Sequence, residues 1–239
     1  MRADAVVMSG GKQRIRSAGP DADLQAFLQG VFSCSVEAAA NIGARASVRR
    51  YPARAVILKQ GERAEITFLM IAGKAHALTF GPDGQIILLH EFHSGDFFGA
   101  VAQADPAPED AEVIAVEVVR ASAFRALDFL ELIESYACVG VAVSRTLFRQ
   151  LRVTATRMVE RTTLSAAGRV HMELLRLVRL SDGKTLNPAP VLSALAVRVN
   201  STRETVSRTI SALERRGVIR REGKALVIVA PRRLEEMII

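Results

Sequence analysis

The period of the hydrophobic residues changes near position 128. Before it, short apolar runs are separated by clusters of Gly, Pro, Asp and Ser, and the runs cover residues 55–58, 66–71, 74–80, 85–90 and 113–119. Many short strands at near-regular spacing, with turn residues between them, are typical of a β-sandwich or β-barrel. The stretch from about 46 to 127 is therefore predicted to be an all-β domain.

From 128 to about 161 the apolar residues follow a helical period that only Gly140 interrupts. A narrow stripe with spacings of 4, 3 and 4 residues, as in a coiled-coil seam, is formed by Leu147, Leu151, Thr154 and Met158. On the pattern alone, the stripe fits packing against the β-domain of the same subunit as well as it fits pairing between two subunits. Ser165 is predicted to cap a further amphipathic helix over 166–180, followed by a loop over 181–190.

Two more helical segments meet at residues 199–202. Asn200 tolerates a left-handed backbone and is predicted to end the first segment, and Thr202 is predicted to cap the second, which runs to about 216. The second helix has an inward stripe of Val206, Ile210 and Leu213. Its outward residues are Arg203, Glu204, Ser207, Arg208 and Ser211.

After Gly217, which ends this helix, residues 218–221 and 225–229 alternate as two strands around the turn Glu222-Gly223-Lys224. The order of helix, turn, helix and hairpin predicts a winged helix-turn-helix. Arg presents a bidentate donor to guanine and Glu accepts from the cytosine amino group, so the outward residues suit base recognition in the major groove. The alternative, an exposed charged helix that binds nothing, does not account for the cap, stripe and wing together.

Charge is unevenly distributed along the 239 residues, although the net value is only +7. Residues 1–140 hold 13 Lys/Arg against 17 Asp/Glu, whereas residues 141–239 hold 19 against 8. The basic surplus lies entirely in the half with the helix-turn-helix, as expected if that half binds double-stranded DNA.

Residues 1–20 form a polar, basic segment that is predicted to be a flexible tail without a signal peptide, and no run is long enough to span a membrane. A cytoplasmic protein is expected, with Cys34 and Cys138 as small buried hydrophobes.

The segment RETVSR at residues 203–208, preceded by LAVRVNST and followed by LERRGVI, resembles the recognition helix of the Crp/Fnr family of bacterial transcription regulators. The elements QGE, IAGKAHAL, GPDGQIILL and SGDFFGA resemble the cyclic-nucleotide-binding β-roll of the same family, and QLRVTATRMVERTTLS resembles its dimerisation helix. The resemblance covers residues 21 to the end. It implies an α+β fold with a β-roll over 21–130, a dimerisation helix over 131–164 and a winged helix-turn-helix over 165–239.

The resemblance also assigns roles. It implies base reading by Arg203, Glu204 and Arg208, and phosphate contacts by Thr202 and Thr205, to which Ser207 and Lys224 are added as further candidates. A homodimer is implied, with the seam formed by Leu147, Leu151, Thr154 and Met158. RNA polymerase is a candidate further partner.

One site departs from the family pattern. Cyclic-AMP-binding members have a Glu after the second glycine of the GD-F-G motif and an Arg-Ser pair about ten residues later, whereas this chain has Ala100 after Gly99 and Glu109-Asp110-Ala111 at the second position. No Lys or Arg occurs between Lys74 and Arg120. Thr154 alone matches a base contact, so the sequence predicts a vestigial effector pocket of Gly99, Ala100, Asp110, Ala111 and Thr154 that does not bind cyclic AMP.

Other ligands and function classes fit less well. The cysteines are too few for the iron-sulfur branch, and GAVAQ at 99–103 offers no haem ligand. His90 and His93 have metal-like spacing but are more simply structural, so neither a metal nor a cofactor is expected. A cyclic-nucleotide-responsive regulator of the same family and a regulatory subunit that carries the β-roll without binding DNA are the alternatives. No arrangement of a nucleophile, a base and an orienting group indicates an enzyme.

Overall fold

The structure, a computed structural model, describes residues 22–81, 85–103, 105, 107–181 and 183–238. The predicted tail at 1–20 lies outside them. Two short helices, α1 (Ala22–Phe32) and α2 (Val36–Ala44), precede the strands. The strands that follow are β1 (Ser47–Tyr51), β2 (Val56–Leu58), β3 (Ile66–Ala72), β4 (Ala75–Phe80), β5 (Ile86–Phe92), β6 (Phe97–Gly99), β7 (Glu112–Ala115) and β8 (Val119–Arg125).

These strands form two four-stranded antiparallel sheets, with the orders β1-β8-β3-β6 and β2-β7-β4-β5. Side chains of both sheets share one buried cluster, in which the ring of Phe98 stacks on Phe68 from its own sheet and on Phe92 from the other, at 5.0 and 4.8 Å between centroids. The β-domain predicted from the short apolar runs and the turn residues between them is thus confirmed as a two-layered β-roll.

The prediction of a single strand over 113–119 is wrong. The chain leaves one sheet at Ala115 and enters the other at Val119, and the linking residues Val116, Glu117 and Val118 are exposed. Because residues 113–119 read VIAVEVV, an apolar run interrupted only by Glu117, the hydrophobic pattern cannot reveal the change of sheet. The pattern also missed β1, whose polar residues are mostly exposed, and β6, which has only three residues.

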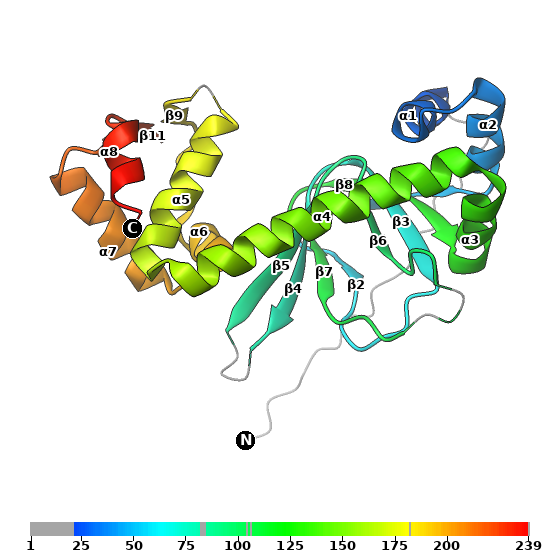
Figure 1. Cartoon of the computed structure of the whole chain (residues 1–239), viewed down its shortest axis with the longest axis horizontal. Coiled ribbons are helices and arrows are strands. Elements are labelled where there is room, and N and C mark those ends of the chain that lie inside the picture. Colours follow the sequence, from blue (N-terminus) through cyan, green and yellow to red (C-terminus); the bar gives the residue numbers. More distant parts are fainter. Residues whose placement is uncertain (1–21, 82–84, 104, 106, 182, 239) are drawn as a thin grey trace, which may run out of the picture.

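Two helices follow, α3 (Ala126–Ser135) and α4 (Ala137–Thr163). The break between them lies at Tyr136, which has an extended backbone, and not at Gly140, which is part of α4. Residues 131–135 therefore belong to α3, and the long helix begins at Ala137 and not at 131. In Figure 1, α4 runs across the β-roll from α1 and α2 at one end to the C-terminal domain at the other.

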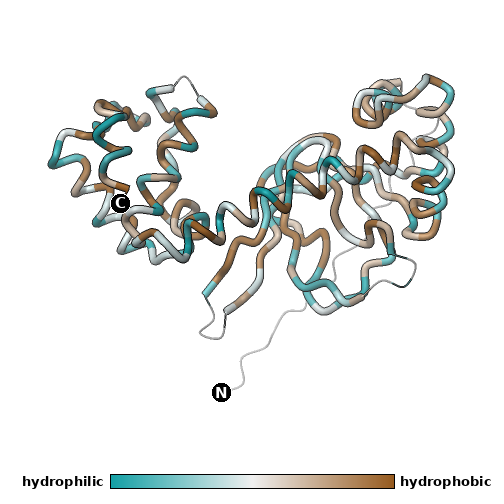
Figure 2. The backbone as a smooth tube through the Cα atoms, in the orientation of Figure 1, coloured by the Kyte–Doolittle hydropathy of each residue, from teal (hydrophilic) through white to brown (hydrophobic). Residues whose placement is uncertain are grey.

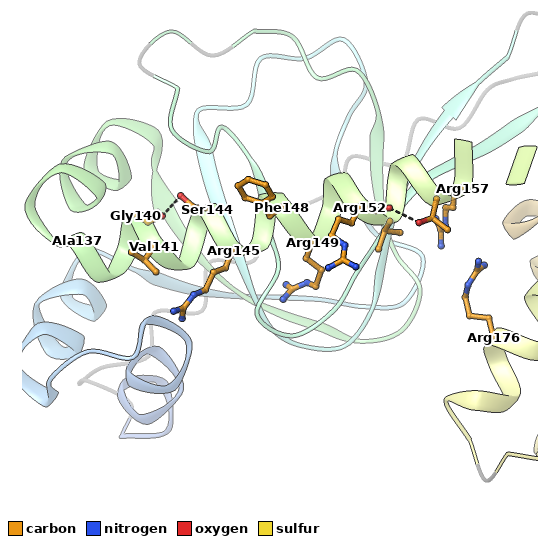
Figure 3. A pocket seen from close by; sticks show the side chains of 12 residues that line it. Ala137, Gly140, Val141, Ser144, Arg145, Phe148, Arg149, Arg152, Arg157 and Arg176 are labelled. Carbon is orange, nitrogen blue, oxygen red and sulfur yellow. Dashed lines mark hydrogen bonds between the residues drawn. The ribbon is translucent and has the colours of Figure 1, made fainter. Parts of the chain in front are cut away.

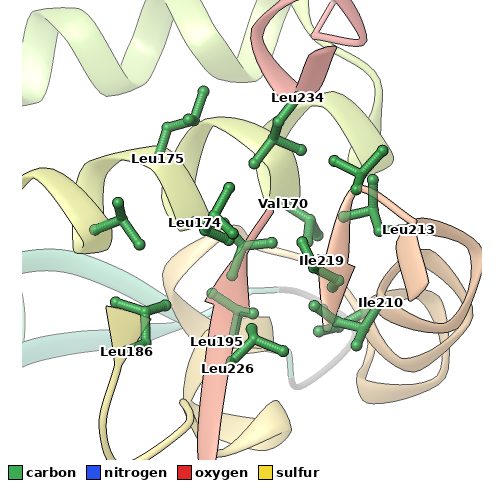
Figure 4. Close-up of a cluster of buried hydrophobic side chains, with 14 of the residues drawn as sticks. Val170, Leu174, Leu175, Leu186, Leu195, Ile210, Leu213, Ile219, Leu226 and Leu234 are labelled. Atoms are coloured by element: carbon green, nitrogen blue, oxygen red, sulfur yellow. The ribbon is translucent and has the colours of Figure 1, made fainter. Parts of the chain in front are cut away.

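The C-terminal domain consists of α5 (Ala166–Arg179), β9 (Thr185–Leu186), α6 (Leu192–Arg198), α7 (Arg203–Arg215), β10 (Ile219–Glu222), β11 (Ala225–Ile228) and α8 (Pro231–Glu236). Ser165 caps α5, as predicted, by accepting a hydrogen bond from the Gly168 amide at 3.0 Å. The predicted loop over 181–190 contains β9, which pairs with β11 and adds a third strand to the wing. Figure 4 shows the shared core of this domain, to which Val170 of α5, Ile210 of α7 and Ile219 of β10 contribute.

Candidate DNA interface

The turn between α6 and α7 has the geometry that its sequence predicts. Asn200 has a left-handed backbone with φ of 49°, and the Thr202 hydroxyl caps α7 by accepting from the Thr205 amide at 3.2 Å. Val206, Ile210 and Leu213 are buried in the domain core. This burial fixes the rotation of α7 about its axis and decides which residues face solvent.

The outward face of α7 carries the predicted base-reading side chains. Arg203, Glu204 and Arg208 are all exposed, whereas Ser207 and Ser211 are half-buried. Hydrogen bonds at the Glu204 amide and with Thr202 lower the pKa of the Glu204 carboxyl, and the charges of Arg203 and Arg208 add to this effect. A charged acceptor and two guanidinium groups are therefore presented together at the N-terminal half of one helix, where helix-turn-helix proteins contact bases.

The candidate phosphate contacts surround this face. Thr202 is exposed at the helix start, and the Thr205 hydroxyl lies 3.1 Å from the Thr202 hydroxyl and 3.4 Å from Nη2 of Arg208. Lys224 is exposed in the wing turn, next to Gly223, which has a positive φ of 58°. The structure also places Arg221 of β10 at the surface beside α7, 2.6 Å from Glu214, a contact that sequence reasoning missed.

The exposed stripe of α4 is wider than its pattern predicts. Leu147, Leu151 and Met158 are 48%, 64% and 67% exposed, and Thr154 is also exposed. Exposed apolar residues of α4 outside this stripe include Val141, Phe148 and Val159. Their spacings of 7 and 11 residues are the signal that sequence reasoning passed over. Figure 2 shows such hydrophobic positions recurring between hydrophilic ones along α4.

A groove of about 990 Å³ lies beside this stripe. Figure 3 shows Phe148 pointing away from Arg145 and Arg149 in its lining, with Arg157 and Arg176 at the end near the C-terminal domain. The opposite face of α4 is fixed to the β-roll, because Gln150 donates to the Phe97 carbonyl at 3.2 Å and Arg161 donates to the Leu88 carbonyl at 3.0 Å. The apolar stripe therefore stays largely exposed in the part of the chain that the structure describes.

The predicted effector pocket contains no cation from its own strands. Gly99 has φ of 81°, and a Cβ there would lie 2.4 Å from the Ile66 carbonyl oxygen. Ala100 is buried, and its backbone is held by the Ile66 carbonyl and the Thr67 hydroxyl. Burial, together with the neighbouring Asp110, raises the pKa of the Glu109 carboxyl.

The surroundings of this pocket add one cation that the sequence did not indicate. Arg63 pairs through its backbone with Pro108, and its largely exposed guanidinium lies 3.4 Å from Asp105. Of the other residues predicted to form the pocket, Ala111 is buried and Asp110 is exposed. Thr154 lies on the exposed stripe of α4.

The cysteines differ in part from their sequence interpretation. Cys34 and Cys138 are half-buried, not buried, and both pack against one apolar cluster of α1, α3 and α4. Burial raises the pKa of the Cys34 thiol, and a hydrogen bond and the charge of neighbouring Cys138 raise it further. No group of three or more His, Cys, Asp or Glu among the described residues could hold a metal ion, and none of the described helices is long and apolar enough to cross a membrane.

Comparisons with known proteins find matches for both the β-roll and the C-terminal domain. The cyclic nucleotide-binding domain family matches residues 48–136, and the Crp-like helix-turn-helix domain family matches residues 168–237. The cAMP-activated global transcriptional regulator CRP of Salmonella typhimurium is 25% identical over 190 residues, covering 77% of this chain and 90% of the relative.

Two further proteins extend the likeness. The CRP-like cAMP-activated global transcriptional regulator of Mycobacterium tuberculosis is 28% identical over 189 residues, covering 77% of this chain and 84% of the relative. The solved structure of FixK2 from Bradyrhizobium japonicum has a TM-score of 0.67 at 20% identity, covering 80% of this chain and 96% of that one. This last likeness concerns the fold.

Proposed function

The chain belongs to the Crp/Fnr family of DNA-binding transcription regulators, and from that premise we propose that it acts as a homodimer that reads an inverted-repeat operator through α7. The observation that carries the proposal is the set of exposed side chains on α7, where Arg203, Glu204 and Arg208 stand on one face while the opposite face is buried. Each subunit would read a half-site of GTGA type, with the two half-sites about one helical turn apart.

The exposed stripe of α4 supports the homodimer. Several large apolar side chains follow one side of a 27-residue helix whose other side is packed on the β-roll. Leaving such a stripe in water is unfavourable, and a second copy of the helix covers it with matching residues about a two-fold axis. The seam then includes Leu147, Leu151, Thr154 and Met158, and it widens to Phe148.

The pocket of the β-roll supports a regulator that does not respond to cyclic AMP, unlike the two relatives whose names describe activation by that nucleotide. Ala100 offers no acceptor for a ribose hydroxyl, and Glu109 and Asp110 place carboxylates where an anionic phosphate would lie. Losing two charge-assisted hydrogen bonds costs about 1.5–3 kcal/mol for each, and the nearby carboxylates add repulsion.

A salt titration of binding to random duplex DNA tests the DNA-binding function. Because Lys and Arg contacts release counterions from the phosphates, the affinity should fall linearly on logarithmic axes as the salt concentration rises. The absence of binding at low salt would overturn the proposed function. A regulatory subunit that only carries the β-roll would give that result.

A further inference from the structure

The first helix of the helix-turn-helix, α6, packs against β5, the edge strand of one β-roll sheet. At this contact the guanidinium of Arg198 lies between two carboxylates. Its Nη2 donates to Glu91 of β5, and its Nη1 donates to Glu173 of α5 at 2.9 Å. The Arg198, Glu91 and Glu173 side chains are only 16%, 10% and 3% exposed. A largely buried ion triad therefore joins the β-roll to the DNA-binding domain.

The triad continues into the long helix. Arg176 of α5 donates to Glu173 and also to Glu160 of α4. We call the five residues Glu91, Glu160, Glu173, Arg176 and Arg198 the interdomain clamp. It connects β5, α4, α5 and α6, so it holds the helix-turn-helix against both the sheet edge and the end of the dimerisation helix.

Glu91 is charged in this arrangement. Burial raises the pKa of its carboxyl, but a 2.7 Å hydrogen bond with His76 and the positive charges of Arg198 and Lys74 outweigh burial and hold the pKa well below its usual range. Removing one member of a buried ion pair leaves the other charge without compensation, which is strongly unfavourable. The contact between Glu91 and Arg198 therefore depends on both charges, and opening it is costly.

A third arginine fixes the turn that precedes α7. Arg169 of α5 donates to the Leu164 carbonyl at the end of α4 at 3.0 Å, and to the carbonyls of Val199 and Asn200 at 2.8 and 3.2 Å. Because Arg198 directly precedes Val199, the clamp and the Arg169 contacts hold adjacent residues of one turn. The direction of α7 is thereby fixed relative to the β-roll and to α4.

We infer that the contact of Arg198 with Glu91 is a ligand-independent lock that sets the direction of the recognition helix, and hence the spacing between the two half-sites that the dimer accepts. This inference rests on the proposed function, because spacing has meaning only for a dimer on a two-part operator. In such a dimer the two α4 helices are joined, and the distance between the recognition helices depends on how each DNA-binding domain is docked. The effector then has no part in bringing α7 into position.

Two variants and one control test the lock. Glu91→Gln keeps the size but removes the charge and replaces one acceptor oxygen with a donor amide. Arg198→Lys keeps the charge but loses the planar guanidinium that donates to both carboxylates at once. The matched control is Arg179→Gln, which breaks the exposed ion pair of Arg179 with Glu235 inside the C-terminal domain. All three are compared with the unaltered full chain.

The first readout uses no DNA. Hydrogen-deuterium exchange followed by mass spectrometry should show faster exchange in β5 and in α6 for both lock variants, by about tenfold, and no change for the control. Unchanged exchange in both lock variants would overturn the inference. Because this readout needs neither an operator nor DNA binding, it gives its result even if the proposed function fails.

The second readout is binding to operators whose half-sites are moved apart or together by one and two base pairs. The unaltered protein should prefer one spacing. In the lock variants, the ratio of the affinity for the preferred spacing to the affinity for the altered spacings should fall about tenfold, while the same half-site sequence is still favoured. An unchanged spacing profile would contradict the inference. Tighter binding of the lock variants to the best operator would also contradict it, because the contact would then restrain DNA binding.

Discussion

Arg149 of α4 donates to Asp96 at 2.6 Å, and Asp96, in the loop before β6, is only 5% exposed. The other oxygen of Asp96 accepts from the His93 amide at 2.8 Å. The aspartate of the SGDFFG motif thus fixes its own loop and joins the β-roll to the long helix. Arg149 is engaged in this contact, which leaves it less able to supply a cation to the nucleotide pocket.

Asp96→Asn should lower the free energy of unfolding by about 1 kcal/mol, because it weakens a charge-assisted hydrogen bond whose arginine is partly in water. Arg63→Ala, which removes the exposed contact with Asp105, should change stability by less than about 0.5 kcal/mol. Urea denaturation of both variants measures the difference. Equal stability of Asp96→Asn and the unaltered protein would show that the contact is not stabilising.

Leu151→Asp should separate the proposed homodimer, because it would bury two facing carboxylates at the seam. The variant should behave as a monomer in light scattering and lose operator binding, while circular dichroism shows that its β-roll remains folded. Leu180→Asp is the matched control, since Leu180 is 81% exposed at the end of α5 and lies off the α4 stripe. A Leu151→Asp dimer of unchanged mass would place the seam elsewhere.

Cyclic AMP should not bind the β-roll with useful affinity. Isothermal titration with millimolar cyclic AMP is expected to give no saturable heat, because Ala100 offers no acceptor and Glu109 and Asp110 place carboxylates at the phosphate position. Saturable binding tighter than about 10 μM, or roughly −6.8 kcal/mol, would contradict this expectation. Loss of such binding in Arg63→Ala would then identify Arg63 as the missing cation.

The C-terminal domain should lose stability as the pH falls below about 6.5. His171 is buried, and its Nδ1 lies 2.9 Å from the Met237 carbonyl oxygen. Burial lowers the pKa of this histidine from 6.5, and the hydrogen bond only partly opposes the effect. The unfolded chain therefore binds the proton more readily, so the stabilising contribution is present above the ordinary pKa and is lost as the pH falls.

Thermal unfolding between pH 7.5 and about 5 measures this dependence. The chain with His171→Gln should show a flatter curve for the C-terminal domain, because glutamine does not titrate. The same slope in both proteins would assign the pH dependence to other groups.

The recognition helix could be predicted from the sequence because its signals are local. Asn200, Thr202 and the spacing of Val206, Ile210 and Leu213 each act within one or two helical turns. The crossover at 116–118 and the break at Tyr136 could not be predicted, since both depend on which distant strands and helices pack together. The pattern of charged residues along the sequence indicates even less about which distant strands and helices pack together.

The interdomain clamp illustrates that limit. Glu91 and Arg198 are 107 residues apart, and each looks like an ordinary surface charge in the sequence. Only the fold brings β5 against α6, so only the fold distinguishes this pair from the exposed pair of Arg179 and Glu235. The apolar stripe of α4 was predicted at Leu147, Leu151, Thr154 and Met158 because a coiled-coil period is again a local signal.

Selection of binding sites from a pool of random duplex DNA tests the central claim most directly. The unaltered protein should enrich an inverted repeat with GTGA-type half-sites about one helical turn apart. Arg203→Ala or Arg208→Ala should cost about 1–3 kcal/mol per subunit on that site and relax the base preference there, while Arg179→Ala should leave it intact. An enriched sequence without two-fold symmetry, or no enrichment at all, would contradict the proposal that a homodimer reads its operator through α7.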